Sequence, residues 1–358
     1  PKLVGDLAPN PPGSWGTPRR VAIAFDGVLA QTAVVEKLVT GPAVAFAFKE
    51  GVPTPAATAF AAKFGISVDA LERAPGPKGE VIAARATEGG KRLVDVVAAG
   101  LEAAILGIPF KKTMRWGTRK EQFPRPIQYV CAVIDGERVA ATVCGAPTVN
   151  TSVGHWLLSP DAFAVTSAET WETELAKRWV QPSGRARRDT IAAQLAEVAA
   201  GEGADLRVDS ALLDEVVNLV EWPTPVVGEF DAALLSLPER LLVESMKVNQ
   251  RYFPLYRDGK LLNRFVVISN NPAGDAKLVA EGNARVLAAR FHDAKFFFSE
   301  DAKLPLATHG AKLAGMLWLR EVKGAGGKPL TMGQRQDEVG VAALGLLDLC
   351  GASQSVVA

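Results

Sequence analysis

The sequence contains few of the side chains that usually build catalytic and metal sites. Its 358 residues include three cysteines, three histidines and three tyrosines. No CxxC pair is present, whereas a structural zinc site uses about four cysteine or histidine ligands at close spacing. The GxSxG, HExxH, Walker A, Rossmann GxGxxG and kinase signatures are also missing. We therefore predict no metal site and no catalytic residue in this chain.

Long apolar runs and a strong excess of either charge are lacking as well. No stretch approaches the roughly 18 apolar residues of a membrane-spanning helix, and residues 1–16 are Pro/Gly-rich rather than a secretory signal. With 48% hydrophobic residues, 22% charged residues and a net charge of +1, the chain is an ordinary globular protein rather than a disordered or collagenous one. The small, odd number of cysteines favours a reducing compartment with buried thiols.

The charges that are present are unevenly distributed. Six cations and one acid, Glu121, lie in residues 111–125, and five cations with no acid lie in residues 177–188. Clusters of this kind can form a nucleic-acid surface on a protein that is neutral as a whole. The alternative is that they are solvated faces and loops of an ordinary soluble domain, and charge alone favours that interpretation.

Aromatic residues accompany two of the cations. Trp116 follows Arg115, and Tyr252 follows Arg251. Such pairs can hold a phosphate while a ring stacks on a base, or they can be core anchors with an arginine lying across a ring. For Tyr252, inside a predicted strand, the core interpretation is favoured. The candidate RNA-binding residues are Lys111, Lys112, Arg115, Arg119, Lys120, Arg125, Arg185, Arg187, Arg188 and Arg251.

Local patterns predict hairpins and helices in alternation. Residues 127–134 and 138–144 are apolar runs separated by Asp135-Gly136, and residues 251–256 and 264–269 flank Asp258-Gly259. Asp-Gly suits the positive φ angles of a tight hairpin turn, so antiparallel sheets are expected rather than a doubly wound nucleotide-binding fold.

Helices are predicted from apolar spacing, capping residues and prolines. The predicted helices are residues 190–200 ended by Gly201, residues 210–222 capped by Ser210, residues 238–246 opened by Pro238, and residues 281–300. We expect residues 324–329 to be a flexible glycine-rich joint. The predicted fold is α+β, with mixed antiparallel sheets, packed helices and more than one domain.

The expected organisation has four parts. A Pro/Gly-rich leader spans residues 1–16, and an N-terminal α+β region with the basic segments spans residues 17–205. A second α+β unit spans residues 206–305, and residues 306–358 form a weakly specified tail.

Several separated motifs resemble one family in the same order along the chain. KTMRWG at residues 112–117, continuing to FPRPI at residues 123–127, resembles a signature of the β subunit of bacterial-type glycyl-tRNA synthetase. Further matching segments are TPRR at residues 17–20, Gly41-Pro42, Gly154-His155, LDEVVNLVEWP at residues 213–223, GEFD at residues 228–231, SMK at residues 245–247, QRYFP at residues 250–254, Gly282-Asn283, Asp293-Ala294 and residues 296–298. The collinear resemblance covers residues 17–305.

The resemblance implies a division of labour between subunits. In this family an α subunit forms glycyl-adenylate with ATP and Mg²⁺, and the β subunit mainly binds tRNA(Gly) and contacts the α subunit. Cationic segments without a catalytic constellation agree with that role, and no cofactor is expected on this chain. The implied location is the bacterial cytoplasm or an organelle, such as a chloroplast or mitochondrion.

The chain also departs from the family pattern. Family β subunits are considerably longer, and Asn249 replaces the histidine that usually precedes QRYFP. Two interpretations follow. The chain is the N-terminal body of a working β subunit, or it is a shortened homologue that serves as a non-catalytic structural or RNA-contacting subunit of a larger, organellar complex.

Overall fold

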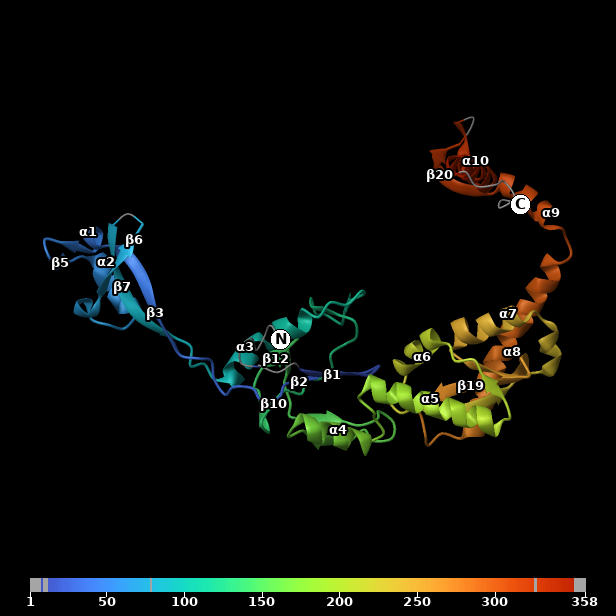
Figure 1. The fold of residues 1–358 in the computed structure, drawn as a ribbon, viewed down its shortest axis with the longest axis horizontal. Coiled ribbons are helices and arrows are strands. Elements are labelled where there is room, and N and C mark those ends of the chain that lie inside the picture. The colour runs from blue at the N-terminus through green and yellow to red at the C-terminus, as the bar shows by residue number, and fades with distance from the viewer. Residues whose placement is uncertain (1–7, 9–11, 78, 325–326, 351–358) are drawn as a thin grey trace. The chain divides into compact units, whose positions relative to one another are not determined.

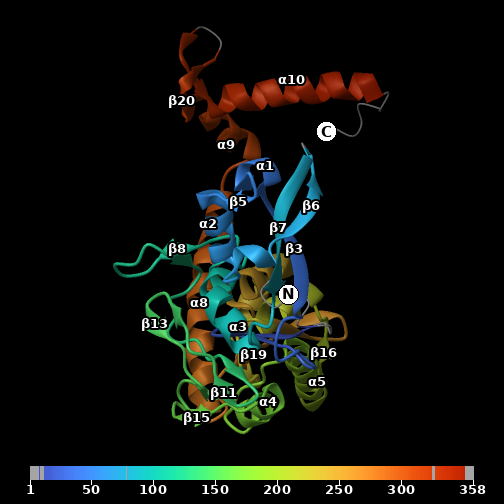
Figure 2. The ribbon, with the colours of Figure 1, turned by 90° about the vertical axis from the view of Figure 1, so that its left-hand side faces the viewer.

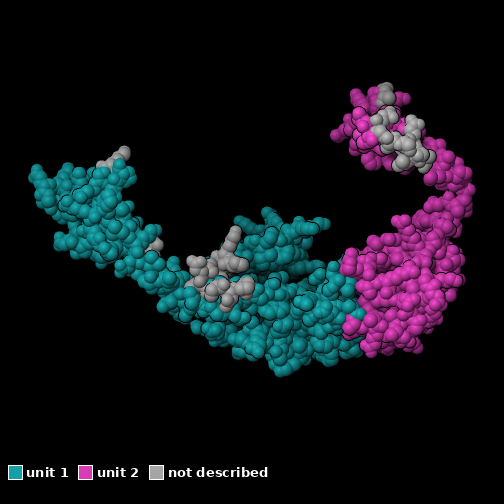
Figure 3. Space-filling view, in the orientation of Figure 1, with its two compact units in different colours: residues 1–192, 213–224, 269–273 teal, residues 193–212, 225–268, 274–358 magenta. Residues whose placement is uncertain are grey.

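The computed structural model describes residues 8, 12–77, 79–324 and 327–350 (Figures 1 and 2). Its helices and small antiparallel sheets confirm the predicted α+β class. The chain divides into two compact units that are discontinuous in sequence (Figure 3). Unit 1 contains residues 1–192, 213–224 and 269–273, and unit 2 contains residues 193–212, 225–268 and 274–358.

Unit 1 begins with short hairpins and a three-stranded sheet. Its elements are β1 (Gly13–Gly16), β2 (Val21–Ala24), β3 (Val35–Ala43), α1 (Val44–Ala47), β4 (Phe48–Lys49), β5 (Val52–Pro53), α2 (Pro55–Lys63), η2 (Val68–Ala70), β6 (Glu72–Gly76), β7 (Gly79–Glu88), α3 (Leu93–Leu106), β8 (Met114–Arg115), β9 (Gln122–Phe123), β10 (Val133–Ile134), β11 (Glu137–Arg138), β12 (Thr142–Val143), β13 (Ala146–Pro147), β14 (Thr151–Val153), β15 (Ala162–Ala164) and α4 (Ala168–Ala176). The sheet has the order β3-β7-β6, and Ala47, Ala57 and Ile82 form the centre of its core with α1 and α2.

Unit 2 is built around a four-stranded sheet of order β16-β18-β19-β17. Its elements are β16 (Asp205–Leu206), β17 (Thr224–Glu229), η3 (Ala232–Ser236), α7 (Glu239–Glu244), the π-helical turn η4 (Ser245–Gln250), β18 (Phe253–Arg257), β19 (Lys260–Ser269), α8 (Ala276–Asp301), α9 (Leu306–Lys312), η5 (Leu313–Gly315), β20 (Leu317–Lys323), β21 (Pro329–Thr331) and α10 (Met332–Cys350). Two helices contribute to both units, α5 (Gly184–Gly201) and α6 (Ser210–Val217).

The core of unit 2 lies where this sheet meets α7, η4 and α8. Leu242, Met246, Phe265, Leu287 and Phe291 are fully buried there. The Tyr252 ring stacks on Phe265 with centroids 4.6 Å apart, and its hydroxyl donates to the Asn283 side chain on α8 at 2.5 Å. Burial raises the pKa of Tyr252 to about 12. The core interpretation of this tyrosine is confirmed.

Both predicted hairpins form on their Asp-Gly turns. Asp135 and Gly136 have φ angles of 49° and 82°, and Asp258 and Gly259 have 49° and 76°. Positive φ at both central residues is the type I′ turn that matches the twist of antiparallel strands. The expectation of one strand over residues 138–144 is wrong, because Cys144 has φ of 48° and starts another tight turn with Gly145 between β12 and β13.

The predicted helices form, with shifted ends. Helix α6 is capped by Asp209 rather than Ser210, because the Asp209 carboxylate accepts from the Ala211 and Leu212 amides. It ends at Val217, before the predicted stop near residue 222, and α5 begins at Gly184 instead of residue 190. Helix α8 covers the predicted 281–300 span and is capped by Asp275.

The predicted joint at residues 324–329 connects the antiparallel strands β20 and β21. Gly324 donates from its amide to the Lys328 carbonyl at 2.9 Å. Residues 325 and 326 of that joint lie outside the described residues. Residues 306–350 belong to the tail for which the sequence predicts little structure. They form α9, the β20–β21 hairpin and the long helix α10 (Figure 2).

Two glycines of unit 2 should respond oppositely to replacement by alanine. A Cβ at Gly228 would lie 2.3 Å from Cζ of Phe265, which is buried and stacked and cannot retreat. Gly228→Ala should lower the free energy of unfolding by about 2 kcal/mol. A Cβ at Gly282, inside α8, would have no neighbour within 4 Å, so Gly282→Ala should raise it by about 0.5–1 kcal/mol. Equilibrium urea unfolding measures both, and a Gly228→Ala variant as stable as the parent would contradict this packing.

Candidate nucleic-acid interface

The first basic cluster, residues 111–125, contains a hairpin of unit 1 and is called the basic hairpin below. Strands β8 and β9 pair Met114 with Phe123 and Arg115 with Gln122. The Trp116 indole Nε1–H donates to the Phe123 carbonyl at 2.8 Å. Gly117 takes a φ of 61° just after it. The indole is therefore a structural part of the hairpin while its ring remains half-buried.

All six cations of this hairpin are exposed. They are Lys111, Lys112, Arg115, Arg119, Lys120 and Arg125. Within the described part of the chain, none of the six forms an ion pair. Their positive charge is therefore available to a polyanion, with Glu121 as the acid among them.

The β12–β13 turn links helix α3 to the basic hairpin. Glu102 at the C-terminal part of α3 accepts a hydrogen bond from the Cys144 amide at 2.7 Å. The neighbouring Gly145 lies under Arg119, since a Cβ there would be 2.6 Å from the Arg119 Nη1. The β12–β13 turn thus packs against the guanidinium of the basic hairpin.

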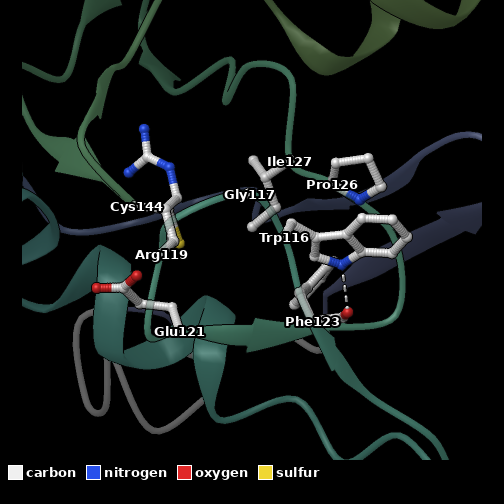
Figure 4. A pocket seen from close by; sticks show the side chains of 8 residues that line it. All are labelled: Trp116, Gly117, Arg119, Glu121, Phe123, Pro126, Ile127 and Cys144. Atoms are coloured by element: carbon white, nitrogen blue, oxygen red, sulfur yellow. Dashed lines mark hydrogen bonds between the residues drawn. The ribbon is translucent and has the colours of Figure 1, made fainter.

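A pocket opens between these two turns. It has a volume of about 260 Å³. Its lining residues are Trp116, Gly117, Arg119, Glu121, Phe123, Pro126, Ile127 and Cys144 (Figure 4). Most of its walls are apolar, and Arg119 and Glu121 supply one charge of each sign.

The second basic cluster does not form one surface. Arg185 is exposed on α5, Arg188 is half-buried and forms an ion pair with Asp214, and Arg187 is completely buried. The Arg187 guanidinium donates to the carbonyls of Gly16, Gln181, Pro182 and Val217. Arg187 is therefore not available to a phosphate, and its assignment as an RNA-binding residue is corrected to a structural one.

Arg251 also differs from an exposed phosphate contact. It is half-buried, adopts φ of 60° after the π-helical turn η4, and donates to the Val248 carbonyl. Its neighbours Tyr252 and Phe253 are buried. The aromatic residues of the predicted pair therefore belong to the core, whereas Arg251 lies at its edge.

A buried charged centre lies close to Arg187 in unit 1. The Glu221 carboxylate is fully buried and accepts from the Thr17 hydroxyl at 2.7 Å, and Arg20 lies 3.0 Å from it. Arg20 also donates to the carbonyls of Val153 and Gly154. Burial lowers the pKa of Arg187, and the charge of Glu221 opposes that effect. No local pattern in the sequence marks Glu221, because this carboxylate meets Thr17 across 204 residues.

Within the described residues, no group of three or more His, Cys, Asp or Glu side chains could hold a metal ion. Of the described helices, none combines the length and apolarity that a membrane crossing requires.

The comparisons with known proteins give the family. A sequence model of the family described as "Glycyl-tRNA synthetase beta subunit" matches residues 7–329. The chain belongs to this family. The match extends beyond residues 17–305 at both ends, so the extent predicted from the motifs was too short.

Individual relatives agree. A glycine–tRNA ligase β subunit of Myxococcus xanthus is 39% identical over 307 residues, which are 85% of this chain and 44% of that protein. The corresponding proteins of Syntrophotalea carbinolica and Moorella thermoacetica are 41% identical over 295 residues and 33% identical over 338 residues, covering 82% and 94% of this chain. The chain spans less than half the length of these relatives, in 44%, 43% and 48% of their sequences. The alternative of a repurposed structural subunit has no support in these similarities.

Family motifs meet at the buried centre. Thr17 and Arg20 come from the TPRR segment, Gly154 from the Gly-His segment, and Glu221 from the LVEWP segment. Three of the segments through which the sequence resembles β subunits are thus joined by hydrogen bonds around one carboxylate. Their role in this family member is to hold unit 1 together.

The buried arginine should be far more important for stability than its exposed neighbour. Arg187→Met leaves four carbonyls without their donor, so we expect the free energy of unfolding to fall by about 3 kcal/mol or more. Arg185→Met, on the same helix but exposed, should change it by less than about 0.5 kcal/mol. Urea unfolding of both variants tests this, and equal losses would argue against the structural role of Arg187.

The half-buried thiol of Cys131 should lose its proton only at high pH. Burial raises its pKa to about 11, so the thiolate fraction grows about tenfold per pH unit up to pH 10. Its alkylation by iodoacetamide, followed by mass spectrometry, should therefore rise over pH 7–10 without a plateau. In urea the same profile should level off near the ordinary cysteine pKa of about 8.5. A plateau below pH 9 in the folded protein would be inconsistent with the burial of this thiol.

Proposed function

We propose that this chain is the body of the β subunit of a heteromeric glycyl-tRNA synthetase and contributes tRNA(Gly) binding and α-subunit contacts to the glycylation of tRNA. The observation that carries the proposal is the family match over residues 7–329 together with the exposed cationic hairpin at residues 111–125. A polyanion such as tRNA is bound largely through phosphate contacts with Lys and Arg, and such contacts need accessible cations without internal partners.

The bond-making chemistry is proposed to lie on the partner. ATP and Mg²⁺ would then be used by the α subunit and would need no site on this chain. The relatives are bacterial proteins, which favours a bacterial cytoplasm as the location. Co-expression with the α subunit of the same organism tests the partnership: the two chains should copurify at fixed stoichiometry. Failure to associate with that subunit would contradict the proposal.

The phosphate contacts have a quantitative signature. Each contact adds about 0.7–0.9 to the slope of log affinity against log salt concentration. Replacing Arg115, Arg119 and Arg125 together by alanine should reduce that slope for tRNA(Gly) by about 2–3 units. Fluorescence anisotropy with labelled tRNA from low to moderate salt measures the slope.

A charge-matched variant provides the control. Arg240, Arg285 and Arg290 are exposed arginines of unit 2, outside the basic hairpin. Their triple replacement by alanine removes the same net charge and should leave the slope within about 0.5 units of the parent. If both triple variants lower the slope equally, the attraction is diffuse and the hairpin residues are not phosphate contacts.

A further inference from the structure

The pocket between the basic hairpin and the β12–β13 turn combines two kinds of wall. Trp116, Phe123 and Ile127 supply flat or branched apolar surfaces, and Arg119 and Glu121 supply a donor and an acceptor (Figure 4). In this view Arg119 and Glu121 lie on the side of Cys144, opposite Trp116 and Phe123. Apolar walls with a few polar groups are the usual composition of a site for a small planar ligand.

The size and the surroundings of the pocket limit the class of ligand that could bind in it. Its volume of about 260 Å³ is below the range of about 300–1,000 Å³ that drug-sized ligands occupy, so it suits a fragment no larger than one heterocycle. Six exposed cations lie on the hairpin that forms it, so an anionic chain would be drawn to its rim. Bases of single-stranded RNA stack on aromatic side chains beside such cations.

We propose that this pocket takes one unpaired nucleobase of the RNA whose phosphates contact the basic hairpin. The inference rests on the proposed function and adds a base site to it. Apolar contact with the Trp116 side would exclude water from the base face. The charged ends of Arg119 and Glu121 point away from Trp116 in Figure 4, and these exposed side chains would turn toward the base edge. The Glu121 carboxylate accepts hydrogen bonds, so it favours a base with an exocyclic amino group, such as cytosine, over uracil.

The reactivity of a cysteine thiol in the pocket can report whether a base is bound there. Cys144 lines it and is half-buried, at the turn that packs against Arg119. Burial raises the pKa of this thiol, Glu121 and Glu102 raise it further, and Arg119 opposes them. Cys144 lines the same pocket as Arg119 and Glu121 (Figure 4), so a base bound there would shield its sulfur from a thiol reagent.

Affinity measurements on the full chain test base recognition. The probes are two RNA hairpins with the same stem and a three-nucleotide 3′ overhang of either cytidine or uridine, which present equal numbers of phosphates. The cytidine probe should bind about five- to tenfold more tightly. Glu121→Ala should remove that preference, whereas Glu281→Ala, which removes one exposed acid on α8, should retain it. Both variants should keep the salt slope.

A protection experiment tests the location. The rate of Cys144 alkylation by N-ethylmaleimide, followed by mass spectrometry, should fall at least about fivefold with saturating cytidine probe, while exposed Cys350 on α10 should react at an unchanged rate. Salt-dependent binding of both probes with equal affinity and an unprotected Cys144 would overturn the base site alone. Absence of salt-dependent binding would overturn the proposed function and the base site with it.

Discussion

One buried carboxylate organises unit 1. Glu221 is fully buried, so it needs charged and hydrogen-bonding partners, and Arg20 and Thr17 supply them from the other end of the chain. Asn270 binds the Glu221 backbone amide at 2.7 Å, which draws a third segment to the same point. A unit assembled from residues 1–192, 213–224 and 269–273 needs such a junction because chain continuity does not hold its parts together.

Burial decides what each arginine can do. Arg187 gives its guanidinium to four carbonyls and is removed from solvent, which makes it a support for the segments around Gly16 and Val217. Arg115 and Arg119 are exposed on the basic hairpin, and neither forms an ion pair within the described residues. Losing a buried partner costs more than losing an exposed one because the remaining groups stay desolvated. Arginines in two similarly cationic segments therefore differ in what they can contact, because only the exposed ones are accessible to a ligand.

Local signals were sufficient for the two Asp-Gly turns and for four of the described helices, α5, α6, α7 and α8. Asp135-Gly136 and Asp258-Gly259 require positive φ and specify their hairpins, and the spacing of apolar residues located α8. Local sequence signals failed where contacts between residues far apart in the chain determine burial or a turn. The burial of Arg187 depends on carbonyls up to 171 residues away. The turn at Cys144 was missed because a cysteine at positive φ has no propensity that marks it, and the Glu102 bond that fixes its amide comes from another element.

The same distinction explains which part of the candidate interface the sequence could indicate. The six cations of the basic hairpin lie within 15 residues, so their density is visible in the sequence. The pocket is not local in sequence, because Cys144 lines it only through the β12–β13 turn, where its amide is bound by Glu102 of α3. A hairpin held by its own ladder and by the Trp116–Phe123 hydrogen bond loses little conformational entropy when a polyanion binds. A paired hairpin, exposed cations and a small apolar hollow together favour recognition of a nucleic acid, a task that needs no acid–base pair on this chain.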